Sequence, residues 1–404
     1  MSSMIKVYKS TDTGARMLSG QAGSLIPVLD DVLVNGYSSS TISAITKTDN
    51  KATVATVGNH GLQNEDICLI TGSDQAEYNG EFRVTVLSAT TFSIPIPNEA
   101  SDVVTGSMSC RKAPLGFVKS YESVNKAVYQ SKDLTSNRAY FRVVDDASSA
   151  RGGAEAMVTM AENMTSTDSW DQLVPSPNRS PIGYCVLKSS AVSTAERHWM
   201  LIGDSKTFYM FIYFQNNDLL SGNSSMSTIV FGDFAPSSPA DAWATIIGAH
   251  PVSVSVSSNQ PFNALFEGVS IPWAANISNT NLNSISHVMV MRDYSGGIGG
   301  RPCQTFGAGT NTSGYMGNTA HIPYPNGPDG GLYLTPILLL HGDPRCIRGR
   351  MRGIYDSPHG RCFGNLDQFS GVNGFPDRKF MSVWGSSSSS SSCSIIIDIT
   401  GPWE

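Results

Sequence analysis

Charged side chains are scarce in this chain of 404 residues. Only 15% of the residues are Asp, Glu, Lys or Arg, whereas about a quarter of a soluble globular chain is normally charged. The surface must therefore be built largely from neutral polar residues such as Ser, Thr, Asn and Gly. A surface of this kind has little electrostatic self-repulsion, which suits a protein that works packed against other subunits.

Signals for membranes, secretion and nucleic acids are missing as well. No apolar stretch reaches the length of about 18 residues that a membrane-spanning helix needs. The first six residues lack an apolar segment after a basic start, so no signal peptide is predicted. The net charge of −6 and the pI near 5.6 do not fit a general binder of phosphate backbones. We expect assembly in a cytoplasm, without a membrane partner and without specific nucleic-acid binding.

The cysteines lack the spacing of a metal or redox motif. Seven of them are scattered over the chain and no C-x-x-C pair occurs, which argues against a zinc ribbon. In a reducing compartment such residues are usually buried free thiols. Oxidation after release from the cell is the alternative fate for some of them. The seven are Cys68, Cys110, Cys185, Cys303, Cys346, Cys362 and Cys393.

Sequence motifs of the common enzyme classes are also absent. The chain has no Gly-x-Ser-x-Gly elbow, no His-Glu-x-x-His pair and no phosphate-binding Gly-x-x-x-x-Gly-Lys-Ser/Thr loop. The glycine-rich residues 296–300 have no lysine or helix start behind them, which favours a flexible loop. We therefore predict a protein that is not an enzyme, with no catalytic residues, no cofactor-binding residues and no cofactor.

Two weak candidates for a metal site remain. Residues 341–346 and 359–362 form a loose echo with His and Cys in each half, but the gaps between His and Cys differ, so Gly-bounded loops are favoured over zinc. Asp204 and Asp233 each follow a Gly at the end of a predicted strand. Turn residues are the ordinary explanation, although two carboxylates at one sheet edge can bind a cation. No metal-binding residue is predicted from either pattern.

Arginines gather only in the C-terminal third. With the chain acidic overall, we favour ion pairs and contacts with neighbouring subunits over contacts with DNA. The five residues of this group are Arg345, Arg348, Arg350, Arg352 and Arg361.

Hydrophobic patterning predicts a mainly β fold, with a β-sandwich-like body, few short helices and a small inserted all-β domain. Residues 25–36 have helical spacing and end on Asn-Gly, which predicts a short helix. Residues 154–164 fit a short helix or a strand. Residues 208–214 are apolar throughout, which predicts either a central strand buried on both faces or a strand with one face against another subunit. Further strands are expected at residues 119–129, 140–144, 184–188, 199–204, 207–214, 228–234 and 287–292.

Residues 41–114 differ from the sequence around them in their pattern of short β-type runs and turns. Four short β-type runs alternate there with Gly/Asn turns, which is typical of a small all-β module inserted into a host domain. We predict a host domain of residues 1–40 and 115–240, the inserted module at 41–114, and a C-terminal β-rich domain at 241–404 with long Gly/Ser loops. Residues 276–328 are expected to be mainly loop. The seven serines at 386–392 are expected to link the strands of a terminal hairpin.

Several runs resemble a family of virion structural proteins of tailed phages and prophages. They are IKVYKSTDTGA at residues 5–15, LSGQAGSLIPVLD at 18–30, LVNGY at 33–37, WMLIGD at 199–204, FYMF at 208–211 and FGDF at 231–234. Within the insertion, HGL at 60–62, Asp66, YNGEF at 78–82 and TTF at 90–92 are similar to a small β-module found in phage tail and neck proteins. The resemblance implies a subunit of the neck, collar or tail without catalytic residues to transfer.

The expected function is therefore structural and the expected location is the virion. Copies of the chain are expected to form a ring and to contact neighbouring virion proteins such as the portal, an adaptor, the tail tube or the baseplate. One alternative is a receptor- or glycan-binding virion protein that uses exposed aromatic residues, with Trp384 as the best candidate. A second is a virion-associated cell-wall hydrolase, which needs a pair of carboxylates that does not stand out in the sequence.

Overall fold

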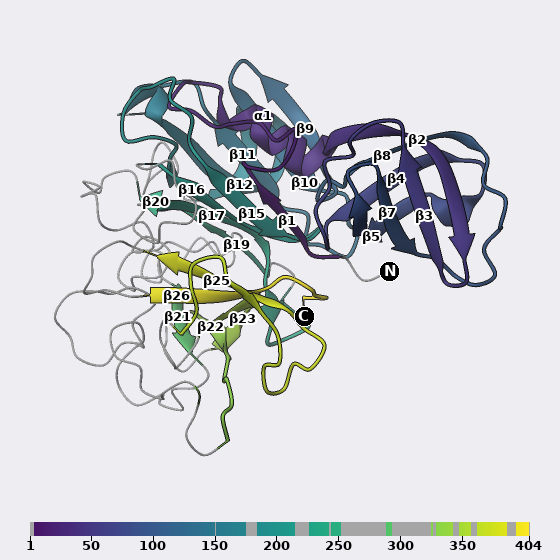
Figure 1. Ribbon diagram of the computed structural model, residues 1–404. Helices are drawn as coiled ribbons and strands as arrows, with labels where there is room; N and C mark the ends of the chain where they lie inside the picture. Colours follow the sequence, from purple (N-terminus) through teal and green to yellow (C-terminus); the bar gives the residue numbers. More distant parts are fainter. Residues whose placement is uncertain are drawn as a thin grey trace.

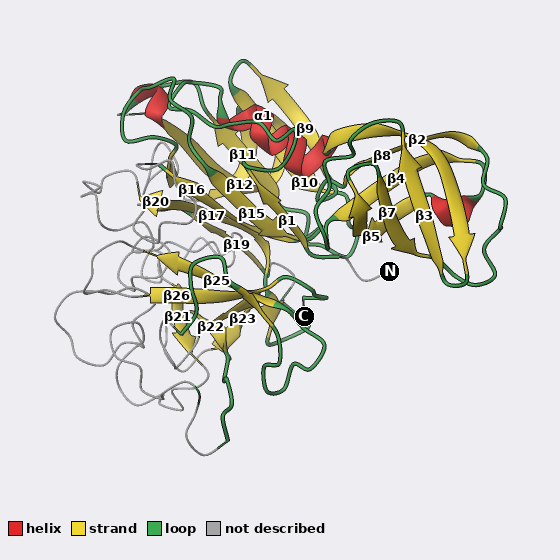
Figure 2. Cartoon of the chain, in the orientation of Figure 1, coloured by secondary structure: helices red, strands yellow, loops and turns green. Residues whose placement is uncertain are grey.

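The protein is built from antiparallel β-sheets with very little helix (Figure 2), which confirms the mainly β fold class. The computed structural model describes residues 4–149, 151–174, 184–214, 226–241, 244–251, 288–292, 325, 329–341, 347–356, 362–385 and 393–403. Within these residues the strands form four sheets, three in the body and one in a module that projects from it (Figure 1).

The central sheet of the body is buried on both faces. In β16, every residue is buried, and alternate side chains enter different cores. Phe208 and Met210 pack toward the second sheet, whereas Tyr209 and Phe211 pack toward the third, because successive side chains of a strand point to opposite faces. The prediction of a central strand at residues 208–214 is confirmed. In spatial order, the sheet consists of β1 (Lys6–Lys9), β15 (Trp199–Gly203), β16 (Thr207–Tyr213), β17 (Met226–Asp233) and β19 (Thr245–Gly248).

The second sheet covers one face of the central sheet. Phe141 of this sheet packs against Phe208 edge to face and against Phe231 at a tilt, with ring centroids 5.5 and 4.8 Å away. In spatial order, its strands are β20 (His250–Pro251), β14 (Tyr184–Leu187), β12 (Glu155–Ser166), β11 (Tyr140–Val144), β10 (Lys126–Ser131) and β9 (Phe117–Ser123), and β13 (Ser169–Val174) pairs with β12.

The second sheet tests two of the sequence predictions. The single strand expected at residues 119–129 is wrong, because the chain reverses at Val124 and Asn125 to form the β9–β10 hairpin. Asn125 has a φ of 55°, a conformation that Asn tolerates in tight turns. Of the two alternatives for residues 154–164 the strand is right, because Glu155–Ser166 form β12 and only Ala154 belongs to a 3-10 turn.

The predicted N-terminal helix is confirmed and packs on the same core. It consists of α1 (Leu25–Leu29) and a π-helical continuation (Asp30–Asn35) that ends at Gly36, where φ is 72°. Its apolar face, including Leu25, Val28 and Leu33, is buried against the second sheet. The described chain also has short 3-10 turns at Ala76–Tyr78 and Gly152–Ala154.

The third sheet lies on the other face of the central sheet, so the body has three β-layers. Met351, Ile354, Met381 and Ile397 of the third sheet share one core with the central sheet. In spatial order, its strands are β21 (Val288–Arg292), β22 (Thr335–His341), β23 (Ile347–Asp356), β26 (Cys393–Asp398), β25 (Phe380–Gly385) and β24 (Gln368–Phe369), and β18 (Ala235–Pro236) pairs with β23.

The C-terminal predictions are met where the structure describes them. Strands β25 and β26 pair as the expected terminal hairpin, while the linking serines lie outside the described residues. Strand β21 matches the strand expected at 287–292. Most of the loop expected at 276–328, including the glycines at 296–300, lies outside the described residues.

The projecting module has its own core. It is made only of residues between Ile42 and Cys110. The two edge strands of its sheet follow one another in sequence around Val84, so the sheet curls into a nearly closed barrel. Tyr37 at its start pairs with Lys112 at its end. In spatial order, the strands are β5 (Gly80–Arg83), β4 (Ile67–Ser73), β8 (Gly106–Lys112), β2 (Tyr37–Thr48), β3 (Lys51–Thr56), β7 (Thr91–Pro95) and β6 (Thr85–Ser88).

The predicted boundary at residue 240 falls between strands of different sheets. Strand β18 before it pairs with the third sheet, whereas β19 after it extends the central sheet. The division of the chain into three domains stays a prediction.

Candidate functional site

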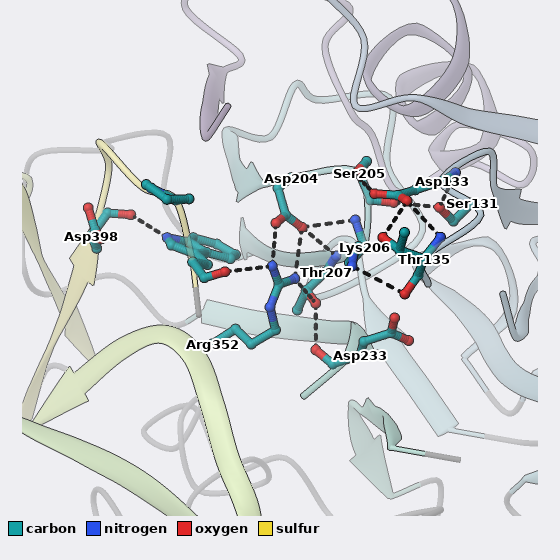
Figure 3. A network of polar contacts seen from close by, with 12 residues as sticks. Ser131, Asp133, Thr135, Asp204, Ser205, Lys206, Thr207, Asp233, Arg352 and Asp398 are labelled. Atoms are coloured by element: carbon teal, nitrogen blue, oxygen red, sulfur yellow. Dashed lines mark hydrogen bonds and ion pairs between the residues drawn. The ribbon is translucent and has the colours of Figure 1, made fainter. Parts of the chain in front are cut away.

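A polar network surrounds the tight turn between β15 and β16 (Figure 3). The Asp204 carboxylate accepts hydrogen bonds from the backbone N–H groups of Lys206 and Thr207, both at 2.9 Å, and so fixes the turn. Arg352 of β23 forms two bonds with the same carboxylate, Nη2 to Oδ2 at 2.7 Å and Nη1 to Oδ1 at 3.1 Å. The side chains of Arg352 and Asp204 are only 9% and 1% exposed. This is a buried, two-pronged ion pair between the third and central sheets.

Arg352 also connects the turn with the C-terminal segment. Its guanidinium donates to Thr207 Oγ1 at 2.9 Å and to the Trp403 carbonyl at 3.0 Å. The Trp403 indole N–H in turn donates to the Asp398 carbonyl at 2.8 Å. The Tyr209 hydroxyl donates to the Arg352 carbonyl at 2.8 Å. Both terminal nitrogens of the guanidinium thus have two protein acceptors each, as a buried charge requires.

The same turn reaches the loop that follows β10 in the second sheet. Ser205 Oγ donates to Asp133 Oδ2 at 2.8 Å, and Ser131 Oγ donates to the Ser205 carbonyl at 2.7 Å. Lys206 Nζ donates to the Thr135 carbonyl at 3.2 Å. One four-residue turn therefore holds elements of all three body sheets.

Asp233 lies beside this network but has different partners. Its carboxylate accepts from the Asn137 backbone N–H at 3.0 Å and from Thr245 Oγ1 at 3.1 Å. Burial raises the pKa of Asp233. The turn-residue interpretation fits Asp204, whereas Asp233 is the last residue of β17 and pairs with Thr245 of β19. Arg352 neutralises Asp204 and protein donors occupy Asp233, so neither carboxylate is placed as a cation ligand. Among the described residues, no group of three or more His, Cys, Asp and Glu side chains is placed to hold a metal ion.

A second ionic cluster lies between the module and the body. Lys112, at the end of β8, contacts Asp12 Oδ2 at 2.7 Å and Asp66 Oδ1 at 2.8 Å, and its side chain is 4% exposed. The Tyr37 hydroxyl donates to Asp12 Oδ2 at 2.7 Å. The ammonium lies 5.6 and 5.9 Å from the ring centroids of Tyr8 and Tyr37, within the range of a cation–π interaction.

Strand β1 makes three further contacts with the module and its exit, two of them buried. Lys6 Nζ donates to Glu81 Oε1 at 2.6 Å and to the Pro114 carbonyl at 2.5 Å. Burial lowers the pKa of Lys6, against the opposing effect of Glu81. The Tyr8 hydroxyl donates to the Ala113 carbonyl at 2.5 Å. Together with Lys112, these contacts fix the orientation of the barrel on the body.

A small cleft lies beside this second cluster, between β1, the module and the third sheet. Glu65 on its wall pairs with Lys379 at 3.2 Å and with Arg83 at 3.6 Å. Arg83 also donates to the Thr400 carbonyl at 3.4 Å. These half-exposed contacts tie the module to the third sheet as well, so the cleft is a seam between three parts of the chain.

In both clusters the charges stabilise contacts between parts of the chain. Each lysine or arginine described above as buried has a carboxylate partner and further acceptors, which is the arrangement of a structural joint. The sequence patterns did not single out Lys6, Asp12 or Lys112. The available signal was weak: Lys6 stands between Ile5 and Val7 in a short apolar run.

The other predicted candidates are placed as follows. Arg352 fits the ion-pair interpretation of the arginine group, and Arg350 is exposed. The side chains of Arg345, Arg348 and Arg361 lie outside the described residues, as does most of the His/Cys echo at 341–346 and 359–362. None of the helices in the described chain is long and apolar enough to cross a membrane. No protein-family model matches the chain, and a search of curated proteins finds no match.

Trp384, the candidate for glycan binding, does not sit at a loop tip. It lies within β25, and its indole N–H donates to the Phe363 carbonyl at 2.9 Å. Replacing Trp384 with Phe is expected to lower the free energy of unfolding by about 0.5–1.5 kcal/mol, because the carbonyl loses its donor. Urea unfolding measures this effect. Unchanged stability together with lost binding on a glycan array would instead favour the receptor-binding alternative.

The described cysteines are thiols, and three of them are buried as predicted. A hydrogen bond with Cys110 and burial raise the pKa of Cys68, and burial raises the pKa of Cys185. A hydrogen bond with Cys68 lowers the pKa of Cys110, but this thiol is buried too. Because the reagent must reach the thiolate, iodoacetamide is expected to label half-buried Cys362 before Cys68, Cys110 and Cys185 in the native protein. Peptide mass spectrometry after timed labelling measures the order, and labelling in urea serves as the control. Equal rates for all four in the native protein would contradict the described burial.

Proposed function

We propose that the chain is a structural subunit of a tailed-phage virion that forms part of the neck, collar or tail. The observation that carries the proposal is the way the projecting barrel is fixed to the body. Two ion pairs cross that junction, Lys112 with Asp12 and Lys6 with Glu81, and Asp66 of the module contacts the same Lys112 ammonium. A module fixed in this way presents one surface in one orientation, as a repeating assembly requires. The assignment to a tailed-phage virion rests on the resemblance of the runs quoted above to virion structural proteins.

The contact surfaces for ring formation must lie outside the central sheet. The aromatic strand β16 is buried within the chain on both faces, so it cannot serve as an exposed patch. Strand β9 is a better candidate, because it forms one edge of the second sheet and an edge strand can pair with a neighbour's chain. Val124, at the tip of its hairpin, is 86% exposed. A ring needs two such complementary surfaces on each copy, and it closes only at the right rotation.

Cryo-electron microscopy of the virions that carry this chain tests the proposal. The expected result is density for the chain in a closed ring at the neck or around the tail, with the portal, an adaptor, the tail tube or the baseplate as neighbours. Density at the tip of a distal fibre would favour receptor binding. Absence of the chain from purified virions would overturn the proposal.

The isolated subunit gives a second test. If ring growth requires a partner ring as template, the purified chain is expected to be monomeric or weakly associated in size-exclusion chromatography with light scattering. The same chain is expected to oligomerise when mixed with the template-bearing particle intermediate. A chain that forms closed rings alone would contradict the template requirement while leaving the structural role in place.

A further inference from the structure

Lys188 and Asp145 form the most deeply buried ion pair in the described chain. Both side chains are 0% exposed. Asp145 directly follows β11 and Lys188 directly follows β14, and these strands flank β12 in the second sheet. The Lys188 backbone N–H donates to the Ala154 carbonyl at 2.9 Å, just before β12 begins. The pair therefore spans three neighbouring strands at one end of the sheet.

The immediate surroundings of the pair are polar and well defined. Lys188 Nζ contacts Asp145 Oδ1, the Gln21 carbonyl at 2.6 Å and Ser24 Oγ at 3.2 Å. The other carboxylate oxygen, Asp145 Oδ2, accepts the Leu25 backbone N–H at 2.9 Å. The two oxygens of the carboxyl group thus have different partners: one faces the amine and the other faces a backbone N–H donor.

We propose that Lys188 and Asp145 become joined by an intramolecular isopeptide bond between Lys188 Nζ and Asp145 Cγ. The reaction starts from the neutral amine and the neutral carboxylic acid, formed by proton transfer from Nζ to Oδ1. Nζ attacks Cγ, the Nζ–Cγ bond forms and the Cγ–Oδ1 bond breaks. Oδ1 leaves as water with its own proton and one amine proton. The step consumes no oxidant, reductant or other reactant.

The geometry favours the neutral forms that this reaction needs. Burial lowers the pKa of Lys188 and raises the pKa of Asp145, although each group opposes that effect on the other. A neutral amine has two N–H bonds, which the Gln21 carbonyl and Ser24 Oγ can accept, and one lone pair, which then faces Asp145. The Leu25 N–H is placed to stabilise the negative charge that develops on Oδ2 during attack.

Proximity of the two groups and exclusion of water also favour formation of the bond. Groups held in contact in one orientation react as if at a very high effective concentration, on the order of 10⁵ M or more. Since neither side chain is exposed to solvent, the amide product is also shielded from hydrolysis. The link would constrain the unfolded chain between β11 and β14, and a cross-link of this kind stabilises a fold.

The other buried lysine cluster provides an internal control. Lys112 contacts two carboxylates, Asp12 and Asp66, and lies near two tyrosine rings. The Lys112 amine is therefore shared between two carboxylates and two rings, whereas the Lys188 amine is held against a single carboxyl group. We therefore expect the bond at Lys188 and not at Lys112.

Intact mass spectrometry of the purified, denatured full chain tests the inference. The expected mass is one water below that of the sequence, and a protease digest is expected to yield a branched peptide joining Lys188 to Asp145. A Lys188→Arg variant is expected to keep the full mass, whereas a Lys112→Arg variant is expected to lose one water like the wild type. If either variant does not fold, the mass and the peptide map of the wild-type chain still show whether the isopeptide bond is present.

Two results would overturn the inference: an unmodified mass for the wild-type chain, or a water loss that the peptide map assigns to a different position, such as a succinimide. The measurement uses the chain alone. It is therefore independent of the proposed virion role, and either can fail without the other.

Discussion

Replacing Arg352 with Met is expected to lower the free energy of unfolding by about 3–5 kcal/mol. The substitution leaves the Asp204 carboxylate, 1% exposed, without its counter-ion. It also removes the donors to Thr207 Oγ1 and the Trp403 carbonyl. Met keeps much of the apolar stem, so most of the loss reflects the stranded charge. Urea unfolding of the full chain, followed by tryptophan fluorescence, measures the change.

Arg16→Met is the matched control for this experiment. Arg16 also pairs with an aspartate, Asp31, at 2.6 Å, but its side chain is 61% exposed. Solvent screens such a pair, and its loss is expected to change the unfolding free energy by about 0–1 kcal/mol. Similar effects for the two variants would mean that the network at the β15–β16 turn does not hold the sheets together as described.

Replacing Lys112 with Met is expected to have an effect of the same size, about 3–5 kcal/mol at neutral pH. Asp12 and Asp66 then remain close together at the junction without the cation that both contact. The loss is expected to appear as loosening of the module, detected as faster proteolysis of the chain around residues 37 and 112. Lys379→Met is the control, because Lys379 and its partner Glu65 are both 49% exposed.

The Lys112→Met variant also has an expected pH dependence. Burial already raises the pKa of Asp66 in the wild type, although Lys112 opposes that effect. Without Lys112 the folded-state pKa of Asp66 rises further above its unfolded value, so the folded variant binds protons more readily than the unfolded chain. Stability is then lost as the pH rises through the raised pKa and recovered as the pH falls. A stability difference from wild type that does not shrink on acidification would contradict this account.

Local patterns predicted the elements whose signals lie within a few residues. The helix at residues 25–36 was readable because apolar spacing and a terminal glycine occur together, and Gly36 has the positive φ that such an ending uses. The missed hairpin at Val124 and Asn125 shows the limit. The two strands and their turn read as one continuous β-type segment, and only strand pairing separates them.

The ionic joints could not be predicted, because their partners are remote in sequence. Lys112 and Asp12 are 100 positions apart, and Arg352 and Asp204 are 148 positions apart. A charged residue in a strand is ordinarily solvated, and apart from the apolar neighbours of Lys6 the local sequence does not distinguish a residue that will be buried. Asp204 was identified as a turn residue for the right local reason, but its ion pair with the third sheet was not.

The sequence by itself determined that this protein is mainly β, that the segment around residues 41–114 has a separate texture and that residues 208–214 run through the interior. Hydrophobic alternation and turn residues are local signals, so they can be read without knowing the fold. Only the tertiary structure decided that three sheets stack into one body and that buried charges fix the barrel to it. Those features depend on which distant strands pair, and burial makes an unpaired charge so costly that its partner must be supplied by the fold.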